Sequence, residues 1–567
     1  MNDPAKRAEC SRRHAELLPL LGDHVDRHAR VTPDRPALIE HDTGEVVTYR
    51  RLAQASDAFA AKLLSLGLRR GDVVATSLPF SKEHVFLEYA CFKLGLPIAP
   101  LDLRLKPAEI VEAFDAISPR AYFFLGLTPR VDFRPLVAEV MHGSPRVEHW
   151  VQFQKERDGV LPSATHVLDF ARDVKRRYVV AKLTGSLRRA RRQVGKRDPA
   201  LIIFTTGSTG RPKAALLCHE SVLLQNIGLV VGFGLTSDDR MLVNLPPSHV
   251  GGQTEQLLTT LYGGGTAVLL HVFDAEKSLE AVSRHRVTAC GQIPALFNLE
   301  WRLPSYGSYD LSSLRFAIYG GQSVDRPFLE RLRAMAPQMG SGFGLTETAG
   351  FCTYTPVEWG PGDIADSIGY DSPLAPVTIR EPMDAQGRAG AEKPAGELGE
   401  ICVSGPQVFL GYMNDPDATR RTVSVDGVCY TGDLGRIDGR GLHFAGRAKF
   451  VVKPKGYQVF PTEVEDFITS SFAAAVSTTG VVGAAHDVFG EALVAFVELK
   501  AGARLAREEL DARLRDIAAY KRPSHVVFVG PGELPINRVA KLDYLELGRR
   551  AAAEVDKLRA AGGWDRA

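Results

Sequence analysis

The sequence predicts an α/β fold, with a large multi-layer N-terminal domain built from several sheets and a small α+β C-terminal domain. Short apolar runs alternate with segments of helix length over most of the chain, and this pattern changes near residue 449. The chain has 567 residues, of which 45% are hydrophobic and 24% are charged. A chain of this length and composition can bury a large core and should divide into more than one domain.

The alternation begins with a helix-like segment at residues 50–67, which is followed by the apolar run 73–79. Further apolar runs at residues 201–207, 267–270 and 314–321 are each followed by a segment of helix length. This alternation is typical of layered α/β domains whose sheets are largely parallel.

The C-terminal region has a different pattern. Residues 441–461 predict two β segments around a Lys-Pro-Lys-Gly turn, and a helix is expected to begin at Thr462 because acidic residues follow in its first turn. Strands at residues 491–499 and 525–529, separated by a helix at residues 507–519, complete a compact α+β unit.

These patterns divide the chain into a large domain at residues 1–448 and a small domain at residues 449–567, with the boundary at Lys449. No internal repeat is visible. We expect both domains to be needed for function, since motifs of chemical interest occur in each.

The charge balance argues against a nucleic-acid-binding protein. The chain has 69 basic and 67 acidic residues, a net charge of +2, whereas nucleic-acid binding requires a strongly basic face. The seven cysteines form no C-x-x-C pair, so we expect reduced thiols and no zinc site. No export signal or membrane-spanning run is visible, and the expected location is the cytoplasm.

One segment is locally basic. Residues 175–197 contain ten basic and no acidic residues, with apolar residues between them. Such a segment is usually a solvated surface helix or loop. The alternative is a contact for an anionic partner, such as a membrane surface, an acidic carrier protein or a phosphate-rich cofactor.

The stretch FTTGSTGRPK at residues 204–213 has the composition of a phosphate-binding loop. Its glycines allow the backbone to approach an anion, its hydroxyls can donate hydrogen bonds, and Lys213 adds a positive charge. It is not a Walker A loop, because Arg211 and Pro212 separate Gly210 from the lysine.

Three later stretches also contain side chains that are suited to binding or catalysis. In GSGFGLTETAG, at residues 340–350, Phe343 offers a stacking face, Thr346 a hydroxyl and Glu347 a carboxylate suited to Mg²⁺. In YTGDLGRID, Asp433 lies in a tight turn where its carboxylate could accept bonds from both hydroxyls of a ribose. In LPINRVAKLD, Lys541 is expected in a loop.

In this order, the four stretches resemble the adenylate-forming superfamily, which includes acyl-CoA and aryl-CoA synthetases, firefly luciferase and the adenylation domains of nonribosomal peptide synthetases. The resemblance covers nearly the whole chain, including GELGEICVSGPQVFLGYMNDPDAT at residues 396–419. It implies a two-step reaction with ATP and Mg²⁺ as cofactors. A carboxylic acid is first converted to an acyl adenylate with release of pyrophosphate, and a thiol or other nucleophile then displaces AMP.

The resemblance also implies roles for single residues. The catalytic residues would be Lys213, Thr346, Glu347 and Lys541, with Glu347 binding the metal and Lys541 bridging carboxylate and α-phosphate oxygens. Asp433 and Arg447 would hold the ribose. The β- and γ-phosphates would be held by Thr205, Thr206, Gly207, Ser208, Thr209, Gly210 and Lys213. The adenine side would include Gly320, Gly321, Gln322, Gly342, Phe343 and Gly344.

In this superfamily the small domain is mobile and rotates between the two half-reactions, here about a hinge at Lys449. The stretch KPKGYQV is similar to the KxKGxQV pattern of aryl-CoA ligases. By that resemblance, Lys453 and Gln458 would approach AMP, while Lys455 and Gly456 would meet CoA.

The acid pocket is less clear from the sequence. The resemblance places around it the stretch PPSHVGGQTE at residues 246–255, which contains His249 and Gly251, together with Tyr319 and Phe351. The aromatic residues favour an aryl or medium-size acid. His249 is open to two interpretations, an acceptor-channel residue or a core histidine with satisfied hydrogen bonds.

Three functions remain open at this point. The first is an acid:CoA ligase, favoured by KPKGYQV. The second is an adenylating enzyme that transfers its acyl group to a carrier protein in trans or to another nucleophile, favoured by Val272, which stands where CoA-using members often have a basic residue. The third is a scaffold without turnover, which the retained Lys213, Glu347 and Lys541 argue against.

Overall fold

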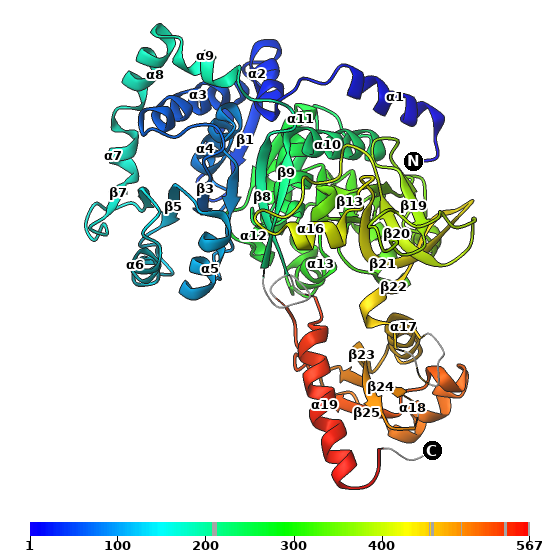
Figure 1. Ribbon diagram of the computed structural model, residues 1–567. Coiled ribbons are helices and arrows are strands. Elements are labelled where there is room, and N and C mark those ends of the chain that lie inside the picture. The colour runs from blue at the N-terminus through cyan, green and yellow to red at the C-terminus, as the bar shows by residue number, and fades with distance from the viewer. Residues whose placement is uncertain (207–211, 453, 455–458, 489, 538–540, 565–567) are drawn as a thin grey trace.

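The computed structural model describes residues 1–206, 212–452, 454, 459–488, 490–537 and 541–564. Its large N-terminal body contains two seven-stranded sheets and a four-stranded sheet, and a small C-terminal domain with a three-stranded sheet lies below it (Figure 1). The predicted α/β class and the division into a large and a small domain are therefore confirmed.

The first large sheet has the order β14-β13-β12-β10-β11-β1-β2. Its neighbouring strands are parallel except for β1 and β2, which form an antiparallel pair. The strands are β1 (Pro36–Glu40), β2 (Val46–Thr48), β10 (Arg240–Val243), β11 (Thr266–Leu269), β12 (Ala289–Gln292), β13 (Phe316–Tyr319) and β14 (Gln338–Gly340).

The second large sheet has the order β7-β6-β5-β3-β4-β8-β9. It is parallel except for the antiparallel β8–β9 hairpin, whose strands flank the predicted phosphate loop. The strands are β3 (Val74–Ser77), β4 (Ile98–Pro100), β5 (Ala121–Leu125), β6 (His149–Phe153), β7 (Ala164–His166), β8 (Pro199–Thr206) and β9 (Pro212–Cys218).

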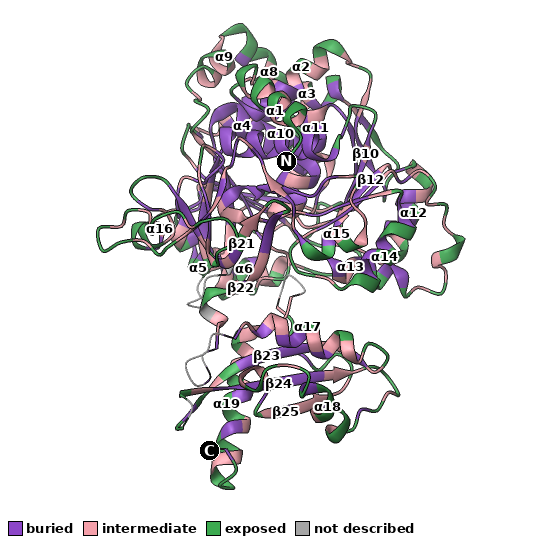
Figure 2. Ribbon diagram, turned by 90° about the vertical axis from the view of Figure 1, so that its right-hand side faces the viewer, coloured by how far each residue is buried: buried purple, intermediate pink, exposed green. Residues whose placement is uncertain are grey.

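A central helix, α10 (His219–Phe233), follows β9 and is buried along its whole length (Figure 2). Most of its residues are apolar, and its polar side chains, such as Gln225 and Asn226, are buried as well, as expected of a helix enclosed by other elements. The other helices and helical turns of the large body are α1 (Pro4–Ala15), α2 (Leu21–Val31), α3 (Tyr49–Ser65), α4 (Lys82–Leu94), α5 (Pro107–Ile117), α6 (Arg134–Gly143), α7 (Val167–Arg172), α8 (Val174–Leu183), α9 (Ser186–Arg191), η1 (Gly251–Leu258), α11 (Thr259–Gly263), α12 (Ala275–His285), α13 (Pro294–Trp301), η2 (Tyr306–Ser308), α14 (Arg326–Met335), η3 (Thr346–Thr348), α15 (Pro361–Asp366) and α16 (Pro416–Thr422).

The four-stranded sheet is antiparallel and leads into the small domain through η4 (Ala448–Phe450). Its strands are β19 (Val377–Arg380), β20 (Gly399–Val403), β21 (Cys429–Asp438) and β22 (Gly441–Arg447). Two short antiparallel pairs complete the large body, formed by β15 (Gly344–Leu345), β16 (Gly350–Phe351), β17 (Thr353–Tyr354) and β18 (Tyr370–Asp371).

The small domain has apolar clusters of its own on both faces of its sheet. Its elements are α17 (Pro461–Ser471), β23 (Val476–His486), β24 (Gly490–Leu499), α18 (Arg507–Leu514), η6 (Ala519–Lys521), β25 (His525–Val529) and α19 (Tyr544–Ala560). Helix α17 begins one residue before the predicted Thr462, because Pro461 occupies the first helical position and the Glu463 carboxylate accepts the Phe460 N–H at 3.2 Å. Helix α18 ends earlier than predicted, at Leu514, where the backbone turns.

No helix within the described ranges combines the length and the apolar character needed to cross a membrane.

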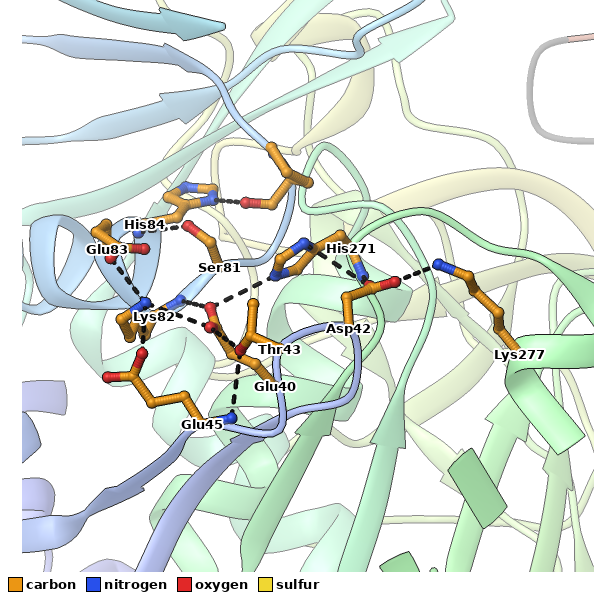
Figure 3. Close-up of polar contacts among 11 residues, drawn as sticks. Glu40, Asp42, Thr43, Glu45, Ser81, Lys82, Glu83, His84, His271 and Lys277 are labelled. Atoms are coloured by element: carbon orange, nitrogen blue, oxygen red, sulfur yellow. Dashed lines mark hydrogen bonds and ion pairs between the residues drawn. The ribbon is translucent and has the colours of Figure 1, made fainter. Parts of the chain in front are cut away.

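A buried carboxylate joins the two large sheets (Figure 3). Glu40, at the end of β1, is 1% exposed and accepts hydrogen bonds from the Lys82 N–H at 2.7 Å and the Thr43 hydroxyl at 2.9 Å. Its carboxylate also lies 3.4 Å from His271 Nε2 and 3.3 Å from Lys82 Nζ. Helix α4 belongs to the layer of the second sheet, whereas His271 follows β11 of the first sheet, so Glu40 links the layers beside the cavity described below.

Burial alone would raise the pKa of Glu40, but the hydrogen bonds from His271, Lys82 and Thr43 outweigh it and lower the pKa to about 2. We expect Glu40→Gln to lower the free energy of unfolding at pH 7 by about 2–3 kcal/mol. The folded-state pKa lies below the unfolded-state value of 4.5. The contribution is therefore complete above about pH 4.5 and is lost as the pH falls toward 2.

Urea denaturation at pH 7 and at about pH 3.5 measures this difference, which should shrink by about 1 kcal/mol at the lower pH. The matched control is Glu45→Gln, because Glu45 contacts the same Lys82 at 3.0 Å but has a side chain that is 52% exposed. A loss for Glu40→Gln no larger than for the control, or one independent of pH, would contradict the linking role of Glu40.

Candidate functional site

A cavity of about 920 Å³ opens where the large body meets the small domain. The small domain contributes Lys541 to the lining of this cavity. The other described lining residues belong to the large body or to η4. The cavity brings together residues from all four sequence stretches and from the expected acid pocket. The third stretch, YTGDLGRID, is represented by Tyr430, Thr431 and Gly432. The predicted site residues in the lining are Thr205, Lys213, His249, Gly251, Tyr319, Gly320, Gly321, Gly344, Thr346, Glu347, Phe351, Arg447 and Lys541.

Four other predicted residues are described but do not line this cavity. Gln322 is exposed to solvent, and Phe343 is 8% exposed and packs into the main core. Gly342 lies against the backbone of Thr353, where a Cβ would come within 2.1 Å of the carbonyl oxygen. Asp433 is buried behind the cavity wall. Their contacts with a nucleotide remain predictions.

Several predicted residues lie outside the described part of the chain. Gly207, Ser208, Thr209 and Gly210 of the phosphate loop are among them, as are Lys453, Lys455, Gly456 and Gln458. The backbones of Thr206 and Lys449 are described but their side chains are not. The roles predicted for these residues stay predictions.

Tyr412 connects the two charged groups predicted to act on phosphate and metal. Its hydroxyl donates a hydrogen bond to Glu347 Oε1, and Lys213 Nζ lies 5.0 Å from the centre of its ring. Burial and the nearby Glu347 charge raise the pKa of the Tyr412 hydroxyl, so it remains protonated and acts as a donor. Tyr412 was not among the predicted site residues, although it lies in the stretch 396–419 that carried the family resemblance.

Asp433 and Arg447 form an ion pair across adjacent strands. They are direct partners in the β21–β22 register, and Arg447 Nε lies 3.0 Å from Asp433 Oδ1. Burial raises the pKa of the Asp433 carboxyl, while the charges of Arg447 and Lys541 oppose this rise. The strand pairing thus holds Arg447, which lines the cavity, against Asp433, which is buried behind it.

Lys541 extends from the small domain to the Gly320–Gly321 turn of the large body. A Cβ on Gly321 would lie 3.4 Å from Lys541 Cε and 3.5 Å from its Nζ. Gly321 has a φ of +90°, which a residue with a side chain rarely adopts. Asn537 steadies the lysine backbone, because its N–H donates to the Lys541 carbonyl at 2.7 Å and its Oδ1 accepts the Lys541 N–H at 3.1 Å.

Among the described residues, Lys541 has no carboxylate of its own to balance its charge. Burial lowers the pKa of the Lys541 ammonium, the charge of Arg447 lowers it further, and Asp433 acts in the opposite direction. Arg447 is already paired with Asp433. An anion that enters the cavity would therefore be attracted to two cations that share a single carboxylate.

The acid-pocket residues line the part of the cavity near η1, a π-helical segment. Such segments are rare and are frequent at functional sites. Burial lowers the pKa of His249, whose environment also includes the Asp102–Arg104 ion pair. His249 Nε2 has no hydrogen-bond partner within the described residues. The histidine thus lines the cavity as a neutral ring, and its interpretation as a fully satisfied core residue is not supported.

Glu255, in the same π-helical segment, was not predicted as a site residue. Its Oε1 accepts the Phe351 N–H at 3.1 Å, and it lines the cavity. Burial raises the pKa of the Glu255 carboxyl to about 7. It is, however, the last residue of the stretch PPSHVGGQTE, which the family resemblance placed around the acid pocket.

The basic segment 175–197 lies away from the cavity, in α8, α9 and the residues that follow (Figure 1). Most of its basic side chains face solvent, and several are paired with acids of the body. Arg177 lies 2.8 Å from Asp173, and Lys196 lies 2.6 Å from Glu220. These contacts fit a solvated, partly ion-paired surface.

A metal ion in this cavity would depend on few protein ligands. Within the described residues, no cluster of three or more histidine, cysteine or acidic side chains is suited to hold one. Glu347 provides one carboxylate on the cavity wall. A hard cation with one protein carboxylate, completed by phosphate oxygens and water, is the usual mode for Mg²⁺ at nucleotide sites.

Comparison with known families gives two matches in chain order. The description "AMP-binding enzyme" matches residues 25–413, and "AMP-binding enzyme C-terminal domain" matches residues 463–541. The first match alone covers more than half of the chain.

Individual relatives agree with these matches. The chain is 30% identical to the indoleacetate–CoA ligase of Aromatoleum aromaticum, covering 94% of this chain and 98% of that protein. It is 31% identical to the feruloyl-CoA synthase of an Amycolatopsis species, with coverages of 94% and 99%.

The fold also resembles that of ATP-bound MatB from Rhodopseudomonas palustris, with a TM-score of 0.75, 25% identity and coverages of 94% and 99%. The predicted relationship is therefore confirmed: the chain belongs to the AMP-binding enzyme family, the adenylate-forming enzymes.

Proposed function

We propose that this enzyme activates a carboxylic acid as its acyl adenylate with ATP, releases pyrophosphate, and transfers the acyl group to CoA. The observation that carries this proposal is the meeting of Lys213, Glu347, Arg447 and Lys541 in one cavity. The names of the two relatives, both of which form CoA thioesters, favour CoA as the acceptor.

In the first step, a carboxylate oxygen attacks the α-phosphorus and the bond between that phosphorus and the β-phosphate bridging oxygen breaks. Lys541, with little counter-charge of its own, would stabilise the negative charge that two reacting anions bring together. Thr346 would donate to the α-phosphate, and Lys213 would hold the departing pyrophosphate. Asp433 and Arg447 would orient the ribose.

Glu347 fits the role of the protein ligand for Mg²⁺. Its carboxylate lines the cavity and is oriented by the Tyr412 hydroxyl. A bound Mg²⁺ would neutralise phosphate charge during the first step. Tyr412 would act as a positioning residue that selects one orientation of the carboxylate.

In the second step, the CoA thiol attacks the acyl carbon, its proton is lost, and the acyl–oxygen bond to AMP breaks. We propose that the small domain turns about Lys449 between the steps, so that Lys541 leaves and Lys453 and Gln458 approach AMP. Lys455 and Gly456 would then meet CoA. The KPKGYQV stretch supports this assignment.

We propose an aryl acid as the substrate. Tyr319 and Phe351 contribute aromatic walls to the cavity, and the two relatives are named for acids that contain rings. A carrier protein as the acceptor is the second candidate. Val272 favours it, because this residue is 60% exposed at a position where a basic residue would contact the CoA nucleotide.

An acid-dependent assay of pyrophosphate release, run with and without CoA, tests the proposed function. We expect turnover with an aryl acid only when CoA is present, together with a thioester verified by mass spectrometry. Release of a stable adenylate that is indifferent to CoA would contradict the proposed acceptor and favour the carrier protein.

Lys541→Ala should separate the two half-reactions. Because Lys541 would act on charge that develops during adenylation, pyrophosphate release should fall by about 10²–10³. Thioester formation from a supplied acyl adenylate should fall far less. Lys557→Ala is the control, since that lysine is on the outer helix α19 with a side chain that is 71% exposed. Adenylation at the wild-type rate in Lys541→Ala would refute the assignment of this lysine.

Tyr412→Phe keeps the ring beside Lys213 but removes the hydroxyl that orients Glu347. We expect the apparent affinity for Mg²⁺ in adenylation to weaken by about tenfold, with a smaller effect at saturating Mg²⁺. A magnesium titration of the adenylation rate measures this change. Tyr370→Phe also removes a hydroxyl hydrogen bond, 3.2 Å to the Gly439 carbonyl, but lies away from the cavity and should leave the titration unchanged. An unaltered magnesium requirement in Tyr412→Phe would rule out the positioning role.

A further inference from the structure

Glu255 is an acidic side chain among largely apolar neighbours in the cavity wall. Leu229, Met241, Ile318 and Phe351 contribute to the same lining. The mechanism above makes no use of this residue. A carboxyl group in such surroundings destabilises the folded protein unless it has a hydrogen-bond partner.

Only one of its two oxygens has a described partner. Oε1 accepts the Phe351 N–H at 3.1 Å, whereas no hydrogen bond to Oε2 occurs among the described residues. Burial without a neighbouring cation raises the pKa of this carboxyl to about 7. Within the described residues, Glu255 Oε2 therefore remains able to accept a hydrogen bond.

Two glycines lie close to this carboxyl. Gly350 has a φ of +120°, and a Cβ there would come within 2.7 Å of Glu255 Oε1 and 3.1 Å of Gln225 Nε2. A Cβ on Gly251 would lie 3.8 Å from Oε2 but only 2.9 Å from Leu245 Cδ1, so the protein packs closely at both positions. Glu255 is nevertheless only half-buried, and it lines the cavity, so a ligand in the cavity can reach this side chain.

The contacts of Phe351 place Glu255 relative to the reacting end of the cavity. The backbone N–H of Phe351 contacts Glu255, whereas the tip of its ring, Cζ, lies 2.7 Å from the Cβ position of Gly320. The next residue, Gly321, adjoins Lys541. Glu255 is thus separated from the turn that receives Lys541 by about the length of a phenylalanine side chain.

We propose that Glu255 is a specificity-determining residue that selects ring acids with a neutral hydrogen-bond donor, a hydroxyl or N–H group, at the end opposite the reacting carboxylate. This inference rests on the proposed function. With the carboxylate at Lys541, an aromatic ring would extend along Phe351 and bring its distal substituent to Glu255. A donor there would satisfy the second oxygen, whereas an acid lacking one would leave it buried and unpaired.

A matched series of acids tests the proposal. We would measure kcat/KM for acid-dependent pyrophosphate release with phenylacetic and 3-phenylpropanoic acids that carry a 4-hydroxyl, 4-methoxy or 4-aminomethyl group or no substituent. The wild-type enzyme should favour the 4-hydroxyl acid over its methoxy and unsubstituted analogues by at least about tenfold, the expected effect of satisfying a carboxyl oxygen that would otherwise be buried without a partner. A preference for the 4-aminomethyl acid would overturn the proposal in favour of a cationic substrate.

Glu255→Leu should reduce the hydroxyl preference to near unity or invert it, while the KM for ATP stays unchanged. Glu255→Gln, which is closer in shape, keeps an acceptor and should retain part of the preference, so it serves if the leucine variant does not fold. Glu300→Gln is the matched control. Glu300 is also buried, with a pKa raised by burial to about 7, but it bonds Ser278 and Gln292 and does not line the cavity.

Different results would contradict the proposed function and the proposed role of Glu255. Pyrophosphate release that is independent of every acid would contradict the proposed function. Acid-dependent release with the same efficiency for hydroxyl and unsubstituted acids, or a hydroxyl preference that survives in Glu255→Leu, would overturn the role of Glu255 alone.

Discussion

The site depends on one contact between the domains, the approach of the Lys541 ammonium to the Gly320–Gly321 turn. Burial lowers the pKa of this ammonium group, and the positive charge of Arg447 lowers it further. The negative charge of Asp433 raises the pKa of Lys541, but Asp433 is already paired with Arg447. Among the described residues around Lys541, two cations thus share one carboxylate, which suits a site that brings a carboxylate and a polyphosphate together.

Elsewhere in the site, one tyrosine, Tyr412, contacts both an acidic and a basic side chain. There the Tyr412 hydroxyl bonds Glu347, and the ring of the same residue lies beside Lys213. One side chain therefore orients an anion and packs against a cation, so the carboxylate proposed to bind metal and the lysine proposed to bind phosphate both contact the same tyrosine. Glu255 differs from these groups, because among the described residues it has no neighbouring cation and one hydrogen-bond donor, the Phe351 N–H.

The sequence was sufficient to predict the large and small domains, the mostly parallel sheets and the meeting of Lys213, Glu347, Arg447 and Lys541, because ordered motifs and apolar periodicity report these features. It was not sufficient for Tyr412 or Glu255. Tyr412 reaches Glu347 through an isolated bridge between its backbone and Ala215 of β9, and Glu255 is carried by a π-helical segment. Such contacts depend on tertiary packing, which no local pattern encodes. For the same reason the helix end at Leu514 was missed.

The central claim is that a carboxylate oxygen attacks the α-phosphorus of ATP. It is tested most directly with an acid labelled with ¹⁸O in its carboxylate, incubated with the enzyme, ATP, Mg²⁺ and CoA, followed by mass spectrometry of the nucleotide products. Attack at the α-phosphorus predicts AMP that carries one ¹⁸O atom, with unlabelled pyrophosphate. Unlabelled AMP, or label recovered in inorganic phosphate together with ADP, would contradict the account.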